Sequence, residues 1–179
     1  MPSRCNRLGL YEFDSKMPIV HAKAYISPRA SLIGDVEVGE DSSIWEFTVL
    51  RADMNYIRVG KGTSIQDNAT VHTTFTNPTT IGDYVTAGHN CVIHACEIGN
   101  RVVVGIGAIV LTGAKVGDDC VIGAGSVVTE NAVIPPNSLV LGIPGKIKKE
   151  VPEGLKEAFM AGAELYVELG RKHAETGPK

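Results

Sequence analysis

The stretch that decides the fold runs from Ile98 to Val128 and reads IGNRVV VGIGAI VLTGAK VGDDCV IGAGSV V. An aliphatic residue opens each block of six, and a glycine often follows it. An amphipathic helix repeats its apolar residues about every 3.6 positions and a half-buried strand every two, so neither produces this spacing. Short strands joined by tight corners do produce it, because each circuit returns an aliphatic side chain to the interior. The stretch therefore predicts a β-solenoid.

The same spacing extends in both directions along the chain. Its register is broken after Leu50, after Val71 and between Ile93 and Ile98. The aliphatic series is Val20, Ile26, Leu32, Val38, Ile44, Leu50, Val59, Ile65, Val71, Ile81, Ala87, Ile93, Ile98, Val104, Val110, Val116, Ile122, Val128, Ile134 and Val140. We expect this series to form a continuous interior held together by apolar burial.

This repeat resembles that of the hexapeptide-repeat proteins. The resemblance implies an all-β solenoid, a left-handed parallel β-helix with three hexads per coil. Its left hand is an exception to the usual right-handed crossover between parallel strands. We expect the β-helix to occupy residues 20–147, after an N-terminal arm at residues 1–19 and before a C-terminal helix and tail at residues 148–179.

The C-terminal segment has a different periodicity. Apolar and small residues recur there at helical spacing: Leu155, Phe159, Ala163, Tyr166, Val167 and Gly170. This pattern predicts one amphipathic α-helix from Leu155 to about Ala174, packed against the solenoid or across a subunit boundary.

Composition narrows the partners and the compartment. The 179 residues carry a net charge of −3, which gives no reason to expect nucleic acid as a partner. No apolar run reaches the length of a membrane span, so we expect no membrane partner. The four cysteines are too few for a disulfide-rich secreted scaffold, and we expect a cytoplasmic protein. Cys91 and Cys120 occupy a small position of their hexads and are expected to pack inward.

Two histidines fall at equivalent positions of the repeat. His72 is second in the hexad opened by Val71, and His94 is second in the hexad opened by Ile93, three hexads later. With three hexads per coil, both lie on the same face of adjacent coils. Stacked strands are about 4.8 Å apart, which suits two imidazoles that converge on one metal ion.

His89 lies elsewhere in the repeat. It is third in the hexad opened by Ala87, one face earlier than the other two histidines. A catalytic zinc ion typically has three protein ligands and one open position. In a cyclic trimer, His72 and His94 of one subunit would meet His89 of a neighbour. The register therefore predicts that a complete metal site requires an oligomer, and we expect a homotrimer with its metal sites between subunits.

Around these histidines the chain resembles the gamma-class carbonic anhydrases and their close relatives. The matching runs are Arg51-Ala52-Asp53, Gln66-Asp67-Asn68, Val71-His72, Gly88-His89-Asn90 and Ile93-His94. The resemblance implies that His72, His89 and His94 bind zinc, or alternatively iron or cobalt. It further implies a small-molecule substrate, with metal-bound hydroxide attacking carbon dioxide to form bicarbonate reversibly.

The resemblance also assigns roles to residues around the metal. Arg51 would pair with Asp53 and Asp67 to hold the trimer interface, and Gln66 would hydrogen-bond the metal-bound water. Tyr166 in the C-terminal helix would lie close to the site. For Arg51, Asp53 and Asp67, interface ion pairing alone is an equally good interpretation, because such networks occur away from catalytic sites.

Two positions depart from the best-characterised gamma enzymes. Met54 stands where they carry a glutamate after the Arg-x-Asp run, and the connection from Thr73 to Thr80 is short and has no carboxylate. Hydration must export a proton to solvent, so turnover is expected to be slow or absent. The run from Arg51 to Tyr56 resembles a branch that includes reported thioesterases.

Other functions fit parts of the chain. The segment Gly142-Ile143-Pro144-Gly145-Lys146 resembles the terminal motif of hexapeptide acyltransferases that use coenzyme A, and Lys146, Lys148 and Lys149 would then meet a cofactor phosphate. A coil-ending turn followed by solvated lysines is the simpler interpretation of this segment. A catalytically silent trimeric scaffold that binds metal is a third candidate. Metal content and carbon dioxide hydration separate these candidates.

Overall fold

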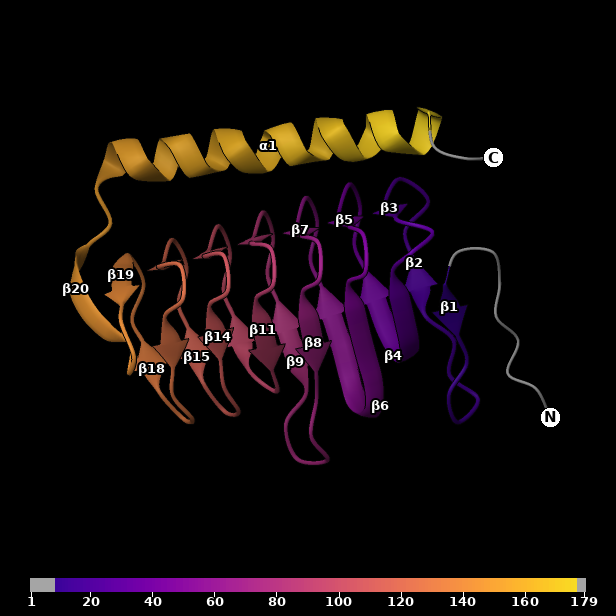
Figure 1. Cartoon of the computed structure of the whole chain (residues 1–179), viewed down its shortest axis with the longest axis horizontal. Helices are drawn as coiled ribbons and strands as arrows, with labels where there is room; N and C mark the ends of the chain where they lie inside the picture. The colour runs from indigo at the N-terminus through magenta and orange to yellow at the C-terminus, as the bar shows by residue number, and fades with distance from the viewer. Residues whose placement is uncertain (1–8, 177–179) are drawn as a thin grey trace.

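A computed structural model of the chain describes residues 9–176. Its strands are β1 (Leu10–Tyr11), β2 (Ile19–Val20), β3 (Tyr25–Ile26), β4 (Ser31–Val38), β5 (Ser43–Ile44), β6 (Val49–Val59), β7 (Ser64–Ile65), β8 (Thr70–His72), β9 (Thr79–Ile81), β10 (Thr86–Ala87), β11 (Val92–His94), β12 (Glu97–Ile98), β13 (Val103–Val104), β14 (Ile109–Val110), β15 (Lys115–Val116), β16 (Val121–Ile122), β17 (Val127–Val128), β18 (Val133–Ile134), β19 (Ser138–Leu141) and β20 (Lys146–Glu150). A helix, α1 (Glu153–Thr176), follows them. Figure 1 shows the strands stacked as successive coils, with α1 lying along one side of the stack.

The coils pair in parallel, three hexads to a turn, as a left-handed β-helix. Ile65 of β7 pairs with Ala87 of β10, which pairs in turn with Val104 of β13. The other two faces repeat this arrangement, so each coil adds one aliphatic residue to each of three interior columns. Every member of the predicted series is buried except Val20, which is partly exposed. The predicted solenoid and its interior are therefore confirmed.

The corners between faces require unusual backbone conformations. Asn90 and Gly107 follow one another in adjacent coils, with φ of 58° and 64°, a region that asparagine and glycine tolerate best. At another corner a Cβ added to Gly60 would lie 2.6 Å from the carbonyl oxygen of Gly82. Glycine therefore recurs at this corner because the backbones of adjacent coils approach too closely for a side chain.

The breaks in the repeat are local departures from a regular coil. Between β4 and β6, Gly34 pairs with Ala52, but the next pair is Val36 with Ile57. Asp35 alone therefore lies opposite residues 53–56, and this longer segment of β6 bulges out of the coil. The second break forms the loop between β8 and β9, which Figure 1 shows projecting beyond the neighbouring corners.

The two ends of the solenoid are covered by the chain itself. Leu10 in β1 pairs in parallel with Leu32 in β4 and is buried, so part of the expected arm at residues 1–19 continues the sheet. At the other end, β20 turns back antiparallel on β19 and crosses the boundary expected at residue 147. Both differences arise because a terminal coil leaves core and strand edges that need a cover. Residues 1–8 of the arm lie outside the described residues.

Helix α1 confirms the predicted amphipathic helix and extends it at both ends. It contacts β3, β5 and β7, and its small residues Ala163 and Gly170 are buried against them. Within residues 9–176, no helix is long and apolar enough to span a bilayer.

The cysteines of the β-helix are core residues. Cys91, Cys96 and Cys120 are buried without disulfides, as expected for Cys91 and Cys120. Burial raises the pKa of the Cys91 and Cys96 thiols to about 12. These thiols are therefore packing groups.

Removing bulk from an interior column should destabilise the fold. Ile122 in β16 is fully buried, and Ile122→Ala is expected to lower the free energy of unfolding by about 2–5 kcal/mol in urea titrations at fixed protein concentration. Ile143, 75% exposed, provides the matched control, with Ile143→Ala costing less than about 0.5 kcal/mol. Equal losses in the two variants would contradict the assignment of the core.

Candidate metal centre

His72 and His94 meet on one face of the β-helix, as the repeat predicted. The two residues pair in register at the ends of β8 and β11. Nδ1 of His72 lies 3.2 Å from Nε2 of His94, with the rings tilted by 47°. Both side chains point outward because the residue before each belongs to an interior column.

The outer nitrogen of each ring is held by an oxygen. Nε2 of His72 lies 3.0 Å from Oδ1 of Asp53, and Nδ1 of His94 lies 3.0 Å from Oγ1 of Thr112. Because a carboxylate only accepts hydrogen bonds, Asp53 assigns the proton of a neutral His72 to Nε2 and leaves a lone pair on Nδ1. The Thr112 hydroxyl can either donate or accept, so it permits the tautomer of His94 with a lone pair on Nε2.

This arrangement fits a metal ion. Two imidazole nitrogens that each lie 2.0–2.1 Å from a tetrahedral zinc ion are about 3.3 Å apart. The separation between His72 and His94 is 3.2 Å. Ligand histidines in metalloproteins also have the second nitrogen held by a carboxylate or another oxygen, as Asp53 and Thr112 do here.

Arg51 and Asp53 complete the charge around this pair. Arg51 is in register with His72 on the preceding coil and forms an ion pair with Asp53. Burial alone would raise the pKa of Asp53, but hydrogen bonds from Arg51 and His72 outweigh it and hold the pKa below its ordinary value. Burial lowers the pKa of His94, and the charges of His72 and Arg51 lower it further. The site therefore favours a carboxylate and an unprotonated His94, the forms that support metal binding.

His89 lies at a different corner, as predicted. It follows β10, which belongs to the other sheet, and its Nδ1 lies 2.8 Å from Oδ2 of Asp67. This contact leaves Nε2 as the nitrogen available to a ligand. The His89 side chain is 41% exposed.

Within one chain, His89 therefore remains separate from the pair formed by His72 and His94. Among residues 9–176, no three His, Cys, Asp or Glu side chains converge to hold a metal ion. Within the chain, Arg51 pairs with Asp53, whereas Asp67 pairs with His89. The pairing of Arg51 with Asp67 remains a prediction for an assembled protein.

Gln66 and Tyr166 lie on the His89 side of the molecule. Gln66 precedes Asp67, and its backbone N–H donates to the carbonyl of Ala87 on the coil of His89. The Gln66 side chain is buried, with 4% of the residue exposed. Burial raises the pKa of Tyr166, and the nearby charge of Asp67 raises it further. Both residues thus accompany His89 rather than His72 and His94.

Two residues next to the histidines were not predicted from the sequence. Thr112 lies on the coil after His94, one position past Leu111, the residue equivalent to His94, so the register alone did not point to it. Trp45 contacts Tyr166, with ring centroids 5.8 Å apart, and has Gln66 beside it on the next coil. Its only signal in the sequence was that the chain has one tryptophan.

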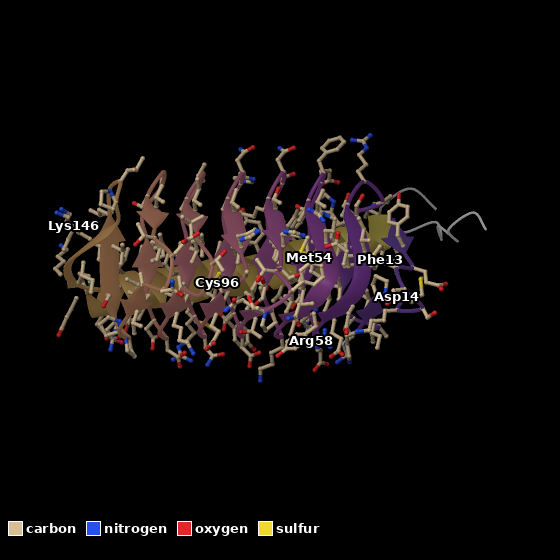
Figure 2. All side chains as sticks on the ribbon, turned by 90° about the horizontal axis from the view of Figure 1, so that it is seen from below. Phe13, Asp14, Met54, Arg58, Cys96 and Lys146 are labelled. Carbon is tan, nitrogen blue, oxygen red and sulfur yellow. The ribbon has the colours of Figure 1, made fainter. Side chains whose placement is uncertain are left out.

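The surface next to Asp53, here called the rim, has two exposed apolar side chains, Met54 and Phe75. Met54 is 38% exposed, and Figure 2 shows it on the side of the prism opposite α1. Phe75, in the loop after β8, is 79% exposed, and its carbonyl accepts a hydrogen bond from Asn55. Met54 and the loop with Phe75 are thus at the surface, at the positions where the best-characterised gamma enzymes carry a glutamate and an acidic loop.

Structural comparison defines the class of protein. The crystal structure of a hexapeptide transferase family protein from Anaplasma phagocytophilum matches with a TM-score of 0.90 and 39% identity, covering 94% of this chain and 99% of that chain. Both the repeat and the backbone are therefore those of a hexapeptide-repeat β-helix protein.

Sequence comparison narrows the class to a family. Carbonic anhydrase of Geobacillus kaustophilus is 38% identical over 90% of this chain and 89% of that protein. Gamma carbonic anhydrase 2, mitochondrial, of Arabidopsis thaliana is 41% identical over 93% of this chain but only 62% of that protein, so this chain spans under two thirds of the plant relative. A family model described as dynactin subunit 5 matches residues 29–169. The chain belongs to the gamma-class carbonic anhydrase-like family of hexapeptide-repeat proteins.

Thr112 should matter to metal affinity. Thr112→Val keeps the shape of the side chain but removes the oxygen that holds His94, so zinc affinity is expected to fall by about 10–100-fold in chelator competition. Thr129→Val, the same change one coil further from the histidines, should leave zinc affinity unchanged. Equal affinities for the two variants would show that Thr112 does not orient His94.

Proposed function

We propose that this protein is a homotrimeric, zinc-dependent carbonic anhydrase-type lyase that hydrates carbon dioxide reversibly to bicarbonate. The observation that carries the proposal is the pair of facing nitrogens on His72 and His94, 3.2 Å apart with both outer nitrogens anchored. Relatives named gamma carbonic anhydrase support the same reaction. Iron or cobalt suits the same imidazole ligands.

A neighbouring subunit would supply His89 to each site. On the face that carries His72 and His94, an outward column interrupted only by the exposed Thr70 contains aliphatic residues that are partly buried in the isolated chain: Val49, Val92, Ile109 and Val127. Such a column favours contact with another protein surface. Arg51 would then meet Asp67 of the neighbour. This contact would align two half-sites, the pair His72 and His94 of one subunit and His89 of the next.

Different side chains of this chain would have different roles in the reaction. A zinc ion at this position would supply Lewis-acid activation of water at neutral pH. Asp53 and Thr112 hold the two ligand rings in place. Gln66, whose carboxamide can both donate and accept hydrogen bonds, would orient the attacking water and the carbon dioxide. The rim residue Met54 can transfer no proton, so export of the proton would depend on solvent and buffer.

A coenzyme A-dependent acyltransferase is the second candidate, favoured by the match to a hexapeptide transferase family protein. The segment from Gly142 to Lys146 lies at the end of the solenoid, where Ile143 is 75% exposed. Acyl transfer does not require two facing imidazoles with anchored outer nitrogens. Hydrolysis of acyl thioesters is a variant of the proposed function, because it would use the same zinc-activated water. A catalytically silent scaffold would bind zinc but catalyse no reaction.

Subunit mixing tests the shared site. His94→Ala and His89→Ala trimers should each lose zinc and hydration activity while retaining the β-helix, because each variant removes a ligand from every interface. When the two are unfolded together and refolded as a 1:1 mixture, about a quarter of the interfaces regain all three ligands. Zinc content and stopped-flow hydration should recover to about that fraction.

The control for this experiment is a mixture of His94→Ala with His72→Ala, which places both defects on the same side of the interface and should recover nothing. Recovery in the control, or none in the test mixture, would contradict a site shared in this way. Wild-type protein that transfers the acetyl group of acetyl coenzyme A to an amine or hydroxyl acceptor but hydrates no carbon dioxide would favour the acyltransferase. Zinc-dependent release of coenzyme A to water, without an acceptor, would favour thioester hydrolysis.

A carboxylate at the rim should accelerate turnover if proton export is limiting. Met54→Glu places an acid beside Asp53, and kcat for hydration is expected to rise about tenfold at low buffer concentration, with a smaller gain at high buffer. Met54→Gln has nearly the same size and no acid, so its kcat should match that of the wild type. Equal kcat values for the two variants would mean that proton transfer does not limit the rate.

A further inference from the structure

An aromatic cluster joins α1 to the β-helix next to the half-site that contains His89. Its centre is Trp45, directly after β5, which is only 7% exposed. The indole contacts Tyr25, Tyr166 and His173, with ring centroids 5.3, 5.8 and 5.1 Å away. Tyr25 belongs to the β-helix, whereas Tyr166 and His173 belong to α1, so the indole connects the two parts.

The indole is fixed on the β-helix side by hydrogen bonds. Its Nε1–H donates to Oγ of Ser43 at 3.0 Å and to Oγ of Ser64 at 2.9 Å. Both serines are 1% exposed. A buried N–H and two buried hydroxyls need one another, because an unpaired polar group in the interior is costly. Phenylalanine at this position would fill most of the space but leave both hydroxyls without this donor.

On the helix side, small residues allow a close approach. Gly170 is buried, and a Cβ added there would lie 3.3 Å from Cβ of Ser43 and 3.4 Å from Cβ of Tyr25. Ala163, two turns earlier on the same face of the helix, is 1% exposed. These small residues let α1 lie close enough to the β-helix for Tyr166 to contact Trp45.

The cluster is linked to the metal centre through β7. Ser64, which accepts from the indole, is two residues before Gln66 and three before Asp67, the partner of His89. The parallel pairing of β5 with β7 places Trp45 and Gln66 at equivalent positions on adjacent coils. Gln66 is 4% exposed, and the helix that carries Tyr166 contacts β7. The position of this corner therefore depends on the packing between Trp45 and α1.

We propose that Trp45 is a positioning residue for the shared metal site. By bonding to Ser64 and packing on Tyr166, it holds α1 against the corner that carries Gln66, Asp67 and His89, and so sets where that corner meets His72 and His94 of the neighbouring subunit. The inference rests on the proposed function, since it concerns the site formed between subunits.

The test compares Trp45→Phe with Leu165→Ala, a change at a 52% exposed position next to Tyr166 on the same helix. Both full-length variants are loaded with cobalt(II), whose visible absorption reports on ligand geometry. We expect Trp45→Phe to change the cobalt band and to lower kcat about tenfold per bound zinc, with KM changed less than twofold. We expect Leu165→Ala to match the wild type in all three measurements.

A second variant covers the case in which Trp45→Phe does not fold. Gly170→Leu leaves the indole in place but pushes α1 away from Ser43 and Tyr25, so the emission of Trp45, the chain's one tryptophan, should shift to the red. The same variant should reproduce the change in the cobalt band. A red-shifted emission with an unchanged cobalt band would overturn the inference.

These readouts keep the two proposals distinguishable. A wild-type protein that binds cobalt but hydrates no carbon dioxide would refute the proposed reaction, and the cobalt band would still test the role of Trp45. A wild-type protein that hydrates carbon dioxide, with Trp45→Phe equal to it in cobalt band and in kcat per bound zinc, would refute only the role of Trp45.

Discussion

The in-register stacking of parallel coils is the constraint on which the rest of this structure depends. Backbone hydrogen bonds between successive coils hold equivalent positions at the spacing of neighbouring strands. The aliphatic columns inside the prism prevent a slip in register, because a shift by one residue would turn every column outward. His72 and His94 are neighbours for this reason, and a tilt of the rings brings their nitrogens to 3.2 Å.

A regular repeat can align two side chains, but it cannot by itself supply the groups that orient them. In this protein those groups come from a departure from the repeat and from the next coil. The bulge in β6 carries Asp53 out of the regular path and to Nε2 of His72, and the following coil provides Thr112 for His94. The rigid stack supplies the spacing of the two imidazoles, Asp53 selects the tautomer of His72, and Thr112 holds the ring of His94.

The same rigidity explains why one chain holds the histidines in two groups. A side chain at a corner cannot turn to the neighbouring face of a stiff prism, so His89 and its partner Asp67 remain apart from His72 and His94. The geometry of a site formed between two such surfaces would depend on the position in which each surface is held. Helix α1 packs on Trp45 close to Gln66 and Asp67, so the C-terminal segment contacts the surface that carries His89.

The sequence by itself determined the solenoid, its interior columns, the C-terminal helix and the shared face of His72 and His94. These features follow from counting residues, because a period of six converts position in the chain into position on the prism. Only the tertiary structure decided that Asp67 pairs with His89, that Thr112 holds His94, and that β1 and β20 cover the ends. Those contacts depend on the path of a bulge, on rotamers and on the packing of a separate helix, none of which the period specifies.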